Sequence, residues 1–394
     1  MNKKLVILSV FAALCFTNLM VSCSDDENIE VGEADQNTVD AVDNIDEDAV
    51  LGEAFTRGEM LTNWADHIII PAFEALADDM DSLSLAANTF TEIPNQENLI
   101  NLKQSWLNAY LAWQTVAMFD IGMAEEITLR NYMNVYPLDA EGMTTTLLAG
   151  GYDLTSVNRQ DEQGFPALDY LLHGLANSEA EIITFYTDEF NGPKYKIFLT
   201  DLVERMRSLT YMVLIDWKER YREEFIERDG SGATESVNSM VNAYIYYFEK
   251  FLRSGKVGIP AGIFSNSPLT DRVEARYRGN VSKELLTTAL HATQNFFNGL
   301  HFDGGSSGMS LQGWIDHLEE TRDTNDLDSL INNQFALIHA QVVNLNDDLG
   351  VQVTIDYRGM LETYDLMQEN IIFMKVDMLQ LFDIKVDYVD ADGD

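Results

Sequence analysis

The sequence predicts an all-α protein that contains two helical-bundle domains. In residues 195–225, large apolar side chains recur every three or four positions, which is the spacing of a bundle seam. Residues 97–127 repeat this spacing with an aromatic stripe that is typical of a buried helix face. No strand pattern is clear before residues 384–388, which we expect to form a short strand-like tip.

Residues 1–22 have the pattern of a bacterial lipoprotein signal peptide. Two lysines precede an apolar stretch that is too short to span a bilayer. Residues 20–23 resemble a lipobox, so we expect cleavage before Cys23 and acylation of that cysteine. The alternative is an ordinary cleaved signal in which Cys23 is incidental. Acylation would anchor the protein in the outer membrane, and residues 24–27, Ser-Asp-Asp-Glu, resemble an acidic tag for export to the cell surface.

Residues 23–53 are expected to form a flexible acidic tether. Residues 24–53 contain twelve acidic side chains, no lysine or arginine, and few large apolar groups. The whole chain has a formal net charge of −40 at pH 7, which excludes nucleic acid as a partner. This charge would attract a cationic or metal-bearing ligand, although acidity also keeps surface proteins soluble.

The rest of the chain reads as a succession of helices separated by short breaks. Pro71 is expected to kink or divide the first helix. The glycine-containing residues 229–232 form the clearest interruption, so we expect one bundle domain over residues 54–228 and a second over residues 233–394. The ranges in which we expect the longer helices are 53–89, 97–127, 195–225, 236–252, 326–345 and 359–381.

Residues 164–174 predict a short helix with a polar face. Pro166 suits the first helical position, and Gly174 suits a left-handed helix end. Alanine and leucine side chains four apart predict two apolar rows that face the core. Pro166, Asp169 and His173 share a different face, where we expect any chemistry to take place.

Five segments of the chain resemble those of the imelysin family. Residues 164–174 are similar to its signature helix, in which the pattern G-x-H-x-x-E precedes an aromatic-Leu-Leu run. Gly164 matches the pattern, whereas Pro166 stands where the family has His and Asp169 stands where it has Glu. The other similar segments are residues 105–122, which resemble the family's second helix, and residues 134–142, 256–262 and 271–277. The resemblance implies an all-α fold, a link to bacterial iron uptake and a metal ion held by the signature helix.

Asp169 and His173 are the candidate metal ligands. Side chains four residues apart on a helix face the same way, so this pair could replace the family's His and Glu in holding a divalent or iron ion. The alternatives are a hydrogen bond between the two side chains or two independent surface residues. Gly164, Pro166 and Glu141 are the further candidates for contact with a ligand. No catalytic residues are predicted, because the sequence contains none of the common catalytic motifs in a suitable context.

The resemblance implies a cell-envelope lipoprotein that binds iron, haem or another metal-bearing ligand for uptake. Its partners would be the membrane, through the lipid anchor, and an outer-membrane uptake complex. A metal-free protein that binds a glycan, a peptide or a partner protein at the same cleft is the alternative. The family's older classification implies a third possibility, a metallopeptidase.

Overall fold

The computed structural model describes residues 55–265, 267–322 and 326–388. The predicted signal peptide, Cys23, the acidic tether and the acidic C-terminal tip lie outside these residues. The described residues all belong to one compact unit that begins at Glu53. Among them, no helix combines the length and the apolar character needed to cross a membrane.

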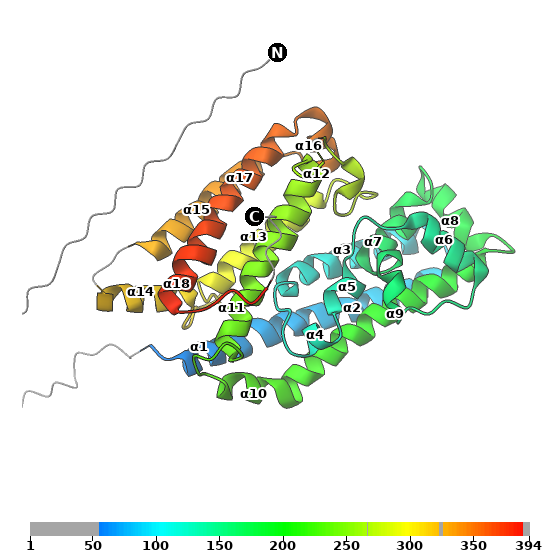
Figure 1. Ribbon diagram of the computed structural model, residues 1–394. Coiled ribbons are helices and arrows are strands. Elements are labelled where there is room, and N and C mark those ends of the chain that lie inside the picture. The colour runs from blue at the N-terminus through cyan, green and yellow to red at the C-terminus, as the bar shows by residue number, and fades with distance from the viewer. Residues whose placement is uncertain (1–54, 266, 323–325, 389–394) are drawn as a thin grey trace, which may run out of the picture. The chain divides into compact units, whose positions relative to one another are not determined.

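The all-α prediction is confirmed, because the described residues form helices and no β-strand (Figure 1). One isolated bridge pairs Leu300 with Ser307. The α-helices are α1 (Arg57–Asn63), α2 (Ile70–Glu92), α3 (Gln96–Val116), α4 (Met123–Glu126), α5 (Leu129–Met133), α6 (Ala140–Ala149), α7 (Gly164–Asp169), α8 (Glu179–Thr187), α9 (Gly192–Asp216), α10 (Arg222–Glu227), α11 (Ser236–Tyr246), α12 (Ile259–Ala261), α13 (Ser282–Phe297), α14 (Leu311–Arg322), α15 (Leu327–Val343), α16 (Leu349–Ile355), α17 (Arg358–Ile372) and α18 (Leu379–Phe382). Shorter 3-10 turns are η3 (Val157–Glu162) and η7 (Thr270–Arg272), and π-helical stretches are η2 (Trp64–Ile69), η4 (Tyr170–Gly174), η5 (Trp217–Tyr221), η6 (Tyr247–Gly258) and η8 (Phe373–Met378).

Pro71 coincides with a division of the first long helix, as predicted. It occupies the first turn of α2, which continues directly from η2, and the carbonyl of His67, four residues before the proline, accepts from the N–H of Phe302 over 2.8 Å. The preceding turn η2 widens into a π-helix, in which the N–H of Ile70 bonds to the carbonyl of Ala65 five residues earlier. The helix therefore continues through the proline with a local change of hydrogen-bonding pattern.

The predicted strand at residues 384–388 is wrong. No second extended segment lies beside these residues within the described chain, so a ladder cannot form. Instead, the side-chain amide of Asn242 on α11 donates to the carbonyl of Lys385 over 3.1 Å and accepts from the N–H of Asp387 over 3.2 Å. The backbone groups of the tip are thus satisfied by a helix side chain.

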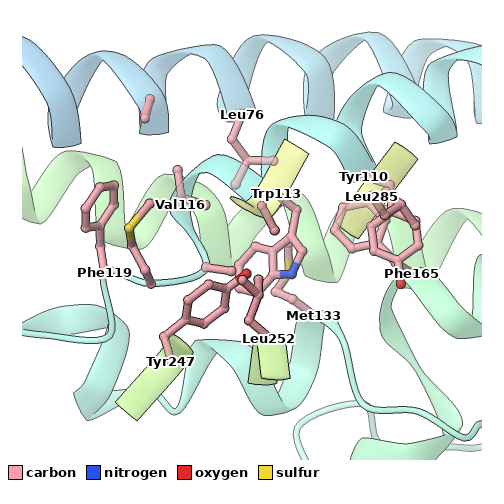
Figure 2. Close-up of a cluster of buried hydrophobic side chains, with 14 of the residues drawn as sticks. Leu76, Tyr110, Trp113, Val116, Phe119, Met133, Phe165, Tyr247, Leu252 and Leu285 are labelled. Atoms are coloured by element: carbon pink, nitrogen blue, oxygen red, sulfur yellow. The ribbon is translucent and has the colours of Figure 1, made fainter. Parts of the chain in front are cut away.

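One hydrophobic cluster runs through the described residues. Helices α2, α3 and α9 pack side by side, and α13 packs against α3 (Figure 1). Figure 2 shows side chains from before and after residues 229–232 in the same cluster, such as Leu76 and Tyr110 beside Leu252 and Leu285. The segment at residues 229–232 connects α10 to α11. A division into two bundle domains at this point stays a prediction.

The predicted signature helix is present, and it is completely buried along α7. It starts at Gly164, two residues before the expected Pro166, and continues into the π-helical turn η4. Gly174 is not left-handed, so that part of the prediction is wrong. Glycine is needed at position 174 for a different reason, because a Cβ there would lie 2.5 Å from Cδ1 of Tyr277. Gly174 therefore allows the ring of Tyr277 to approach the helix.

Replacing Gly164 with alanine is expected to lower the free energy of unfolding by about 2–4 kcal/mol. Its φ of +78° disfavours any residue with a side chain, and a Cβ would lie 2.3 Å from the carbonyl oxygen of Met133. Gly151→Ala is the matched control, since that residue has a φ of +71° and no atom within 4 Å of a Cβ. Urea denaturation should show a smaller loss for Gly151→Ala; equal losses would mean that the contact with Met133 is unimportant.

Candidate functional site

The carboxylate of Asp169 binds the backbone of a distant loop. Asp169 is the last residue of α7, and only 1% of its surface is exposed. Its Oδ2 accepts a hydrogen bond from the N–H of Tyr277, and its Oδ1 accepts one from the N–H of Arg278, both over 2.9 Å. Hydrogen bonds to an ionised acceptor are shorter and stronger than those between neutral groups. The carboxylate therefore ties the signature helix to a segment more than one hundred residues later.

His173 lies against Asp169, so the predicted pair does come together. Its Nδ1 is 3.3 Å from Oδ1 of Asp169 and also 3.3 Å from the carbonyl oxygen of that residue. Because both neighbours are acceptors, Nδ1 is the nitrogen that carries a proton in the neutral ring. The ring packs at 5.0 Å from that of Trp106, and Nε2 is buried without a hydrogen-bond partner.

These residues fit a metal ion poorly. Each oxygen of Asp169 already accepts a backbone N–H, and those two donors would lose their acceptor if a cation took their place. A catalytic zinc ion needs three protein ligands, whereas no group of three or more His, Cys, Asp or Glu side chains suited to a metal occurs in the described chain. Metal binding by Asp169 and His173 stays a prediction, and this geometry weighs against it.

The other predicted contact residues do not gather around a cavity. Gly164 and Pro166 are buried inside α7, with no surface for a ligand in this conformation. Glu141 is exposed on the first turn of α6, which Asp139 caps by accepting the N–H of Gly142 over 2.9 Å. Ligand contact by Gly164, Pro166 and Glu141 stays a prediction.

A second buried polar cluster surrounds Glu274, and sequence reasoning did not single it out. The carboxylate forms an ion pair with Lys256, and the exposed fractions of the two side chains are 3% and 4%. Glu274 Oε1 also accepts from Tyr110 over 3.1 Å, Gln114 over 3.3 Å and Asn134 over 2.7 Å. Both oxygens of the Glu274 carboxylate therefore have hydrogen-bond donors.

Burial shifts the pKa values of the groups that face Glu274. Desolvation lowers the pKa of Lys256, and the attraction of Glu274 opposes that shift. Desolvation also raises the pKa of Tyr110 well above its usual value, and the charge of Glu274 adds to the effect. Tyr110 is therefore a neutral donor at all physiological pH values.

The segments that resemble the imelysin family meet at these two carboxylates. Asn134, the signature helix, the turn at Lys256 and the loop at residues 271–277 all contribute to one or the other. A charged residue between apolar neighbours, such as Glu274 between Val273 and Ala275, is the signal that could have suggested burial. Nothing in the sequence indicates which partners it finds.

A pocket of about 200 Å³ opens beside His173. It lies between α3, the start of α8 and the residue that follows Tyr277. Its lining consists of Ile100, Lys103, Gln104, Leu107, His173, Glu179 and Arg278. Glu179 Oε1 is 3.1 Å from Nζ of Lys103, and Oε2 accepts from Gln96 over 3.1 Å. The pocket thus adjoins the segment of the signature helix at His173.

A larger, mainly apolar pocket of about 290 Å³ includes His291 and His301 in its lining. His291 stacks on His339 at 4.2 Å, and His301 stacks on His67 at 4.2 Å. Burial and the neighbouring His291 lower the pKa of His339 to about 4, so His339 is neutral at physiological pH. This pocket offers imidazole groups in apolar surroundings.

Comparison with known proteins places the fold in a family. The model of the family Imelysin (Peptidase_M75) matches residues 69–369. A crystal structure of a putative iron-regulated protein A precursor from Parabacteroides distasonis ATCC 8503 superposes with a TM-score of 0.68 at 17% identity, covering 84% of this chain and 97% of that one. An Imelysin-like protein from Psychrobacter arcticum 273-4 gives a TM-score of 0.62 at 16% identity, with the same coverage. No curated protein matches the sequence.

The family match spans the five segments that meet at Asp169 and Glu274 and extends over most of the chain. The two crystal structures share the all-α arrangement, which agrees with the fold described above. The chain therefore belongs to the imelysin family.

Proposed function

We propose that the protein is a cell-envelope lipoprotein that binds its ligand without a metal ion at the signature helix. The observation that carries this proposal is the pair of hydrogen bonds from the N–H groups of Tyr277 and Arg278 to the two oxygens of Asp169. A carboxylate in this arrangement stabilises the fold and has no free position facing a cavity. Binding then falls to the neighbouring pocket at His173.

The envelope location and a role in iron uptake form the second part of the proposal. The expected lipid anchor at Cys23 and the acidic tether would hold the folded body outside the membrane. The Parabacteroides protein with a similar fold is described as putatively iron-regulated. We extend that association to this chain as a binding component of an uptake system that acts when iron is scarce.

Purified protein is expected to bind neither Zn²⁺ nor Fe²⁺ at Asp169. Calorimetric titration of each metal into metal-free protein should show no one-to-one site of micromolar affinity, because binding would have to break two charge-assisted hydrogen bonds. Mass spectrometry of the metal content of the purified protein provides an independent measurement.

The variant His173→Gln serves as the control for this titration, since it removes the only other predicted ligand. Wild-type protein and variant should give the same result. One equivalent of metal that binds the wild type and is lost in His173→Gln would contradict the proposal and restore the metal site that the sequence predicts.

A second candidate is binding of an iron- or haem-bearing ligand at the larger pocket. The two histidines in its lining, His291 and His301, favour this candidate because imidazole is a common iron ligand. A haem titration followed by absorbance would show a shifted band that the double variant His291→Ala/His301→Ala lacks. We propose no peptidase activity, because Asp169 and His173 supply two groups where a catalytic zinc ion needs three.

A further inference from the structure

His173, which lines the pocket, has a buried ring nitrogen without a hydrogen-bond partner. The side chain of His173 is 7% exposed, and its Nδ1 faces Asp169. Nε2 is buried and has no hydrogen-bond partner, although His173 lines the cavity. An unpartnered buried nitrogen has a cost in free energy that a ligand could remove. With the proton on Nδ1, Nε2 presents a lone pair, so it would accept a bond from a hydroxyl or ammonium group.

Arg278 supplies a positive charge at the same pocket. Its side chain is exposed, and no described residue forms an ion pair with its guanidinium group. Its backbone is fixed, because its N–H donates to the buried Asp169. The backbone of Arg278 is therefore fixed, whereas its guanidinium group is free to pair with a ligand. The planar N–H donors of a guanidinium group match the two oxygens of a carboxylate.

The remaining charges of the pocket compensate one another. Lys103 and Glu179 lie 3.1 Å apart, so together they add little net charge. The net charge of the chain is −40, but charges beyond about 8 Å are largely screened at physiological ionic strength. The negative charge of Asp169 lies behind His173, so what distinguishes the pocket is Arg278, a cation in its lining without an ion-pair partner among the described residues, and Ile100 and Leu107 add a small apolar wall.

We propose that this pocket binds a small carboxylic acid that carries a hydroxyl or ammonium group beside the carboxylate. The carboxylate pairs with Arg278, and the hydroxyl or ammonium group donates to Nε2 of His173. A volume of about 200 Å³ suits a molecule of this size and is below the range of about 300–1,000 Å³ usual for drug-sized ligands. The inference rests on the proposed metal-free function and names the class of ligand.

Three acids with one carbon skeleton test the proposal. L-malate, L-aspartate and succinate differ at a single position, which carries a hydroxyl group, an ammonium group or a hydrogen. Calorimetric titration of the metal-free protein should show malate or aspartate binding at least tenfold more tightly than succinate, because a site whose buried acceptor needs a donor from the ligand rejects the analogue that lacks one. The variant His173→Phe should abolish this preference, and His173→Gln, which keeps an acceptor, should retain part of it.

A pair of arginine variants tests the charge. Arg278→Gln should weaken binding of the preferred acid at least tenfold. Arg276→Gln, a change at another exposed arginine two residues earlier that does not line this pocket, should alter it less than twofold. Circular dichroism should show that both variants remain folded, because both side chains are exposed.

Absence of binding by all three acids would overturn the inference, as would equal losses in the two arginine variants or an unchanged preference in His173→Phe. These outcomes are separate from the metal titration. A protein that binds no acid and no Zn²⁺ contradicts only this inference, whereas binding of Zn²⁺ lost in His173→Gln contradicts the proposed function itself.

Discussion

Glu274→Ala is expected to lower the free energy of unfolding by about 3–5 kcal/mol, because it leaves the buried ammonium group of Lys256 without its counter-charge. The side-chain amides of Gln114 and Asn134 would also lose their acceptor, whereas Tyr110 keeps Oδ1 of Asn134 at 2.6 Å. Urea denaturation followed by circular dichroism measures this loss. The midpoint should fall while the slope stays constant, since the same surface is exposed on unfolding.

Two controls show whether burial causes the effect. Glu74→Ala breaks an exposed ion pair with Lys218, in which Nζ and Oε1 are 2.7 Å apart, and should cost about 0–1 kcal/mol. The double variant Lys256→Met/Glu274→Leu removes both buried charges and should be more stable than the sum of the single losses implies. A loss from Glu274→Ala no larger than that from Glu74→Ala would refute the structural role assigned to the pair.

Asp169→Asn is expected to lower the free energy of unfolding by about 3–5 kcal/mol. The side-chain amide keeps one oxygen, so one of the two backbone N–H groups loses its acceptor and faces another donor. The second bond also weakens, because its acceptor is no longer charged. Hydrogen exchange at the amides of Tyr277 and Arg278, measured by NMR, should become faster in the variant.

Asp188→Asn provides the matched control, because Asp188 is an exposed carboxylate that also accepts two backbone N–H groups. Those bonds come from Phe190 over 3.0 Å and Asn191 over 2.7 Å. Both bonds end on Oδ1, which asparagine keeps as its amide oxygen, so neither N–H loses its acceptor and the expected loss is at most about 1 kcal/mol. A similar loss at Asp169 would mean that its two hydrogen bonds contribute no more to stability than those of an ordinary exposed turn.

Most of the fold could be predicted because its signals are local. The apolar spacing in residues 195–225 predicted the helix that the structure shows as α9, η5 and α10 from Gly192 to Glu227. Pro71 coincides with a change in the hydrogen-bonding pattern of the helix, because proline has no N–H to donate. The C-terminal strand was wrong, since a strand requires a partner that composition does not reveal.

The site could be predicted only in part. Helical spacing placed Asp169 and His173 together, and in the structure Nδ1 of His173 lies 3.3 Å from Oδ1 of Asp169. The partners of Asp169 are backbone N–H groups 108 and 109 residues later in the chain, which no side-chain pattern encodes. The ion pair of Lys256 and Glu274 and the pocket at Arg278 likewise depend on tertiary packing.

An anomalous-scattering measurement on crystals soaked in Zn²⁺ or Fe²⁺ tests most directly whether Asp169 ties the signature helix to the loop or holds a metal ion. We predict no anomalous peak at Asp169, with the N–H groups of Tyr277 and Arg278 still bonded to its two oxygens. A peak about 2.0–2.2 Å from an oxygen of Asp169, with His173 as a second ligand and the two N–H groups displaced, would contradict the account.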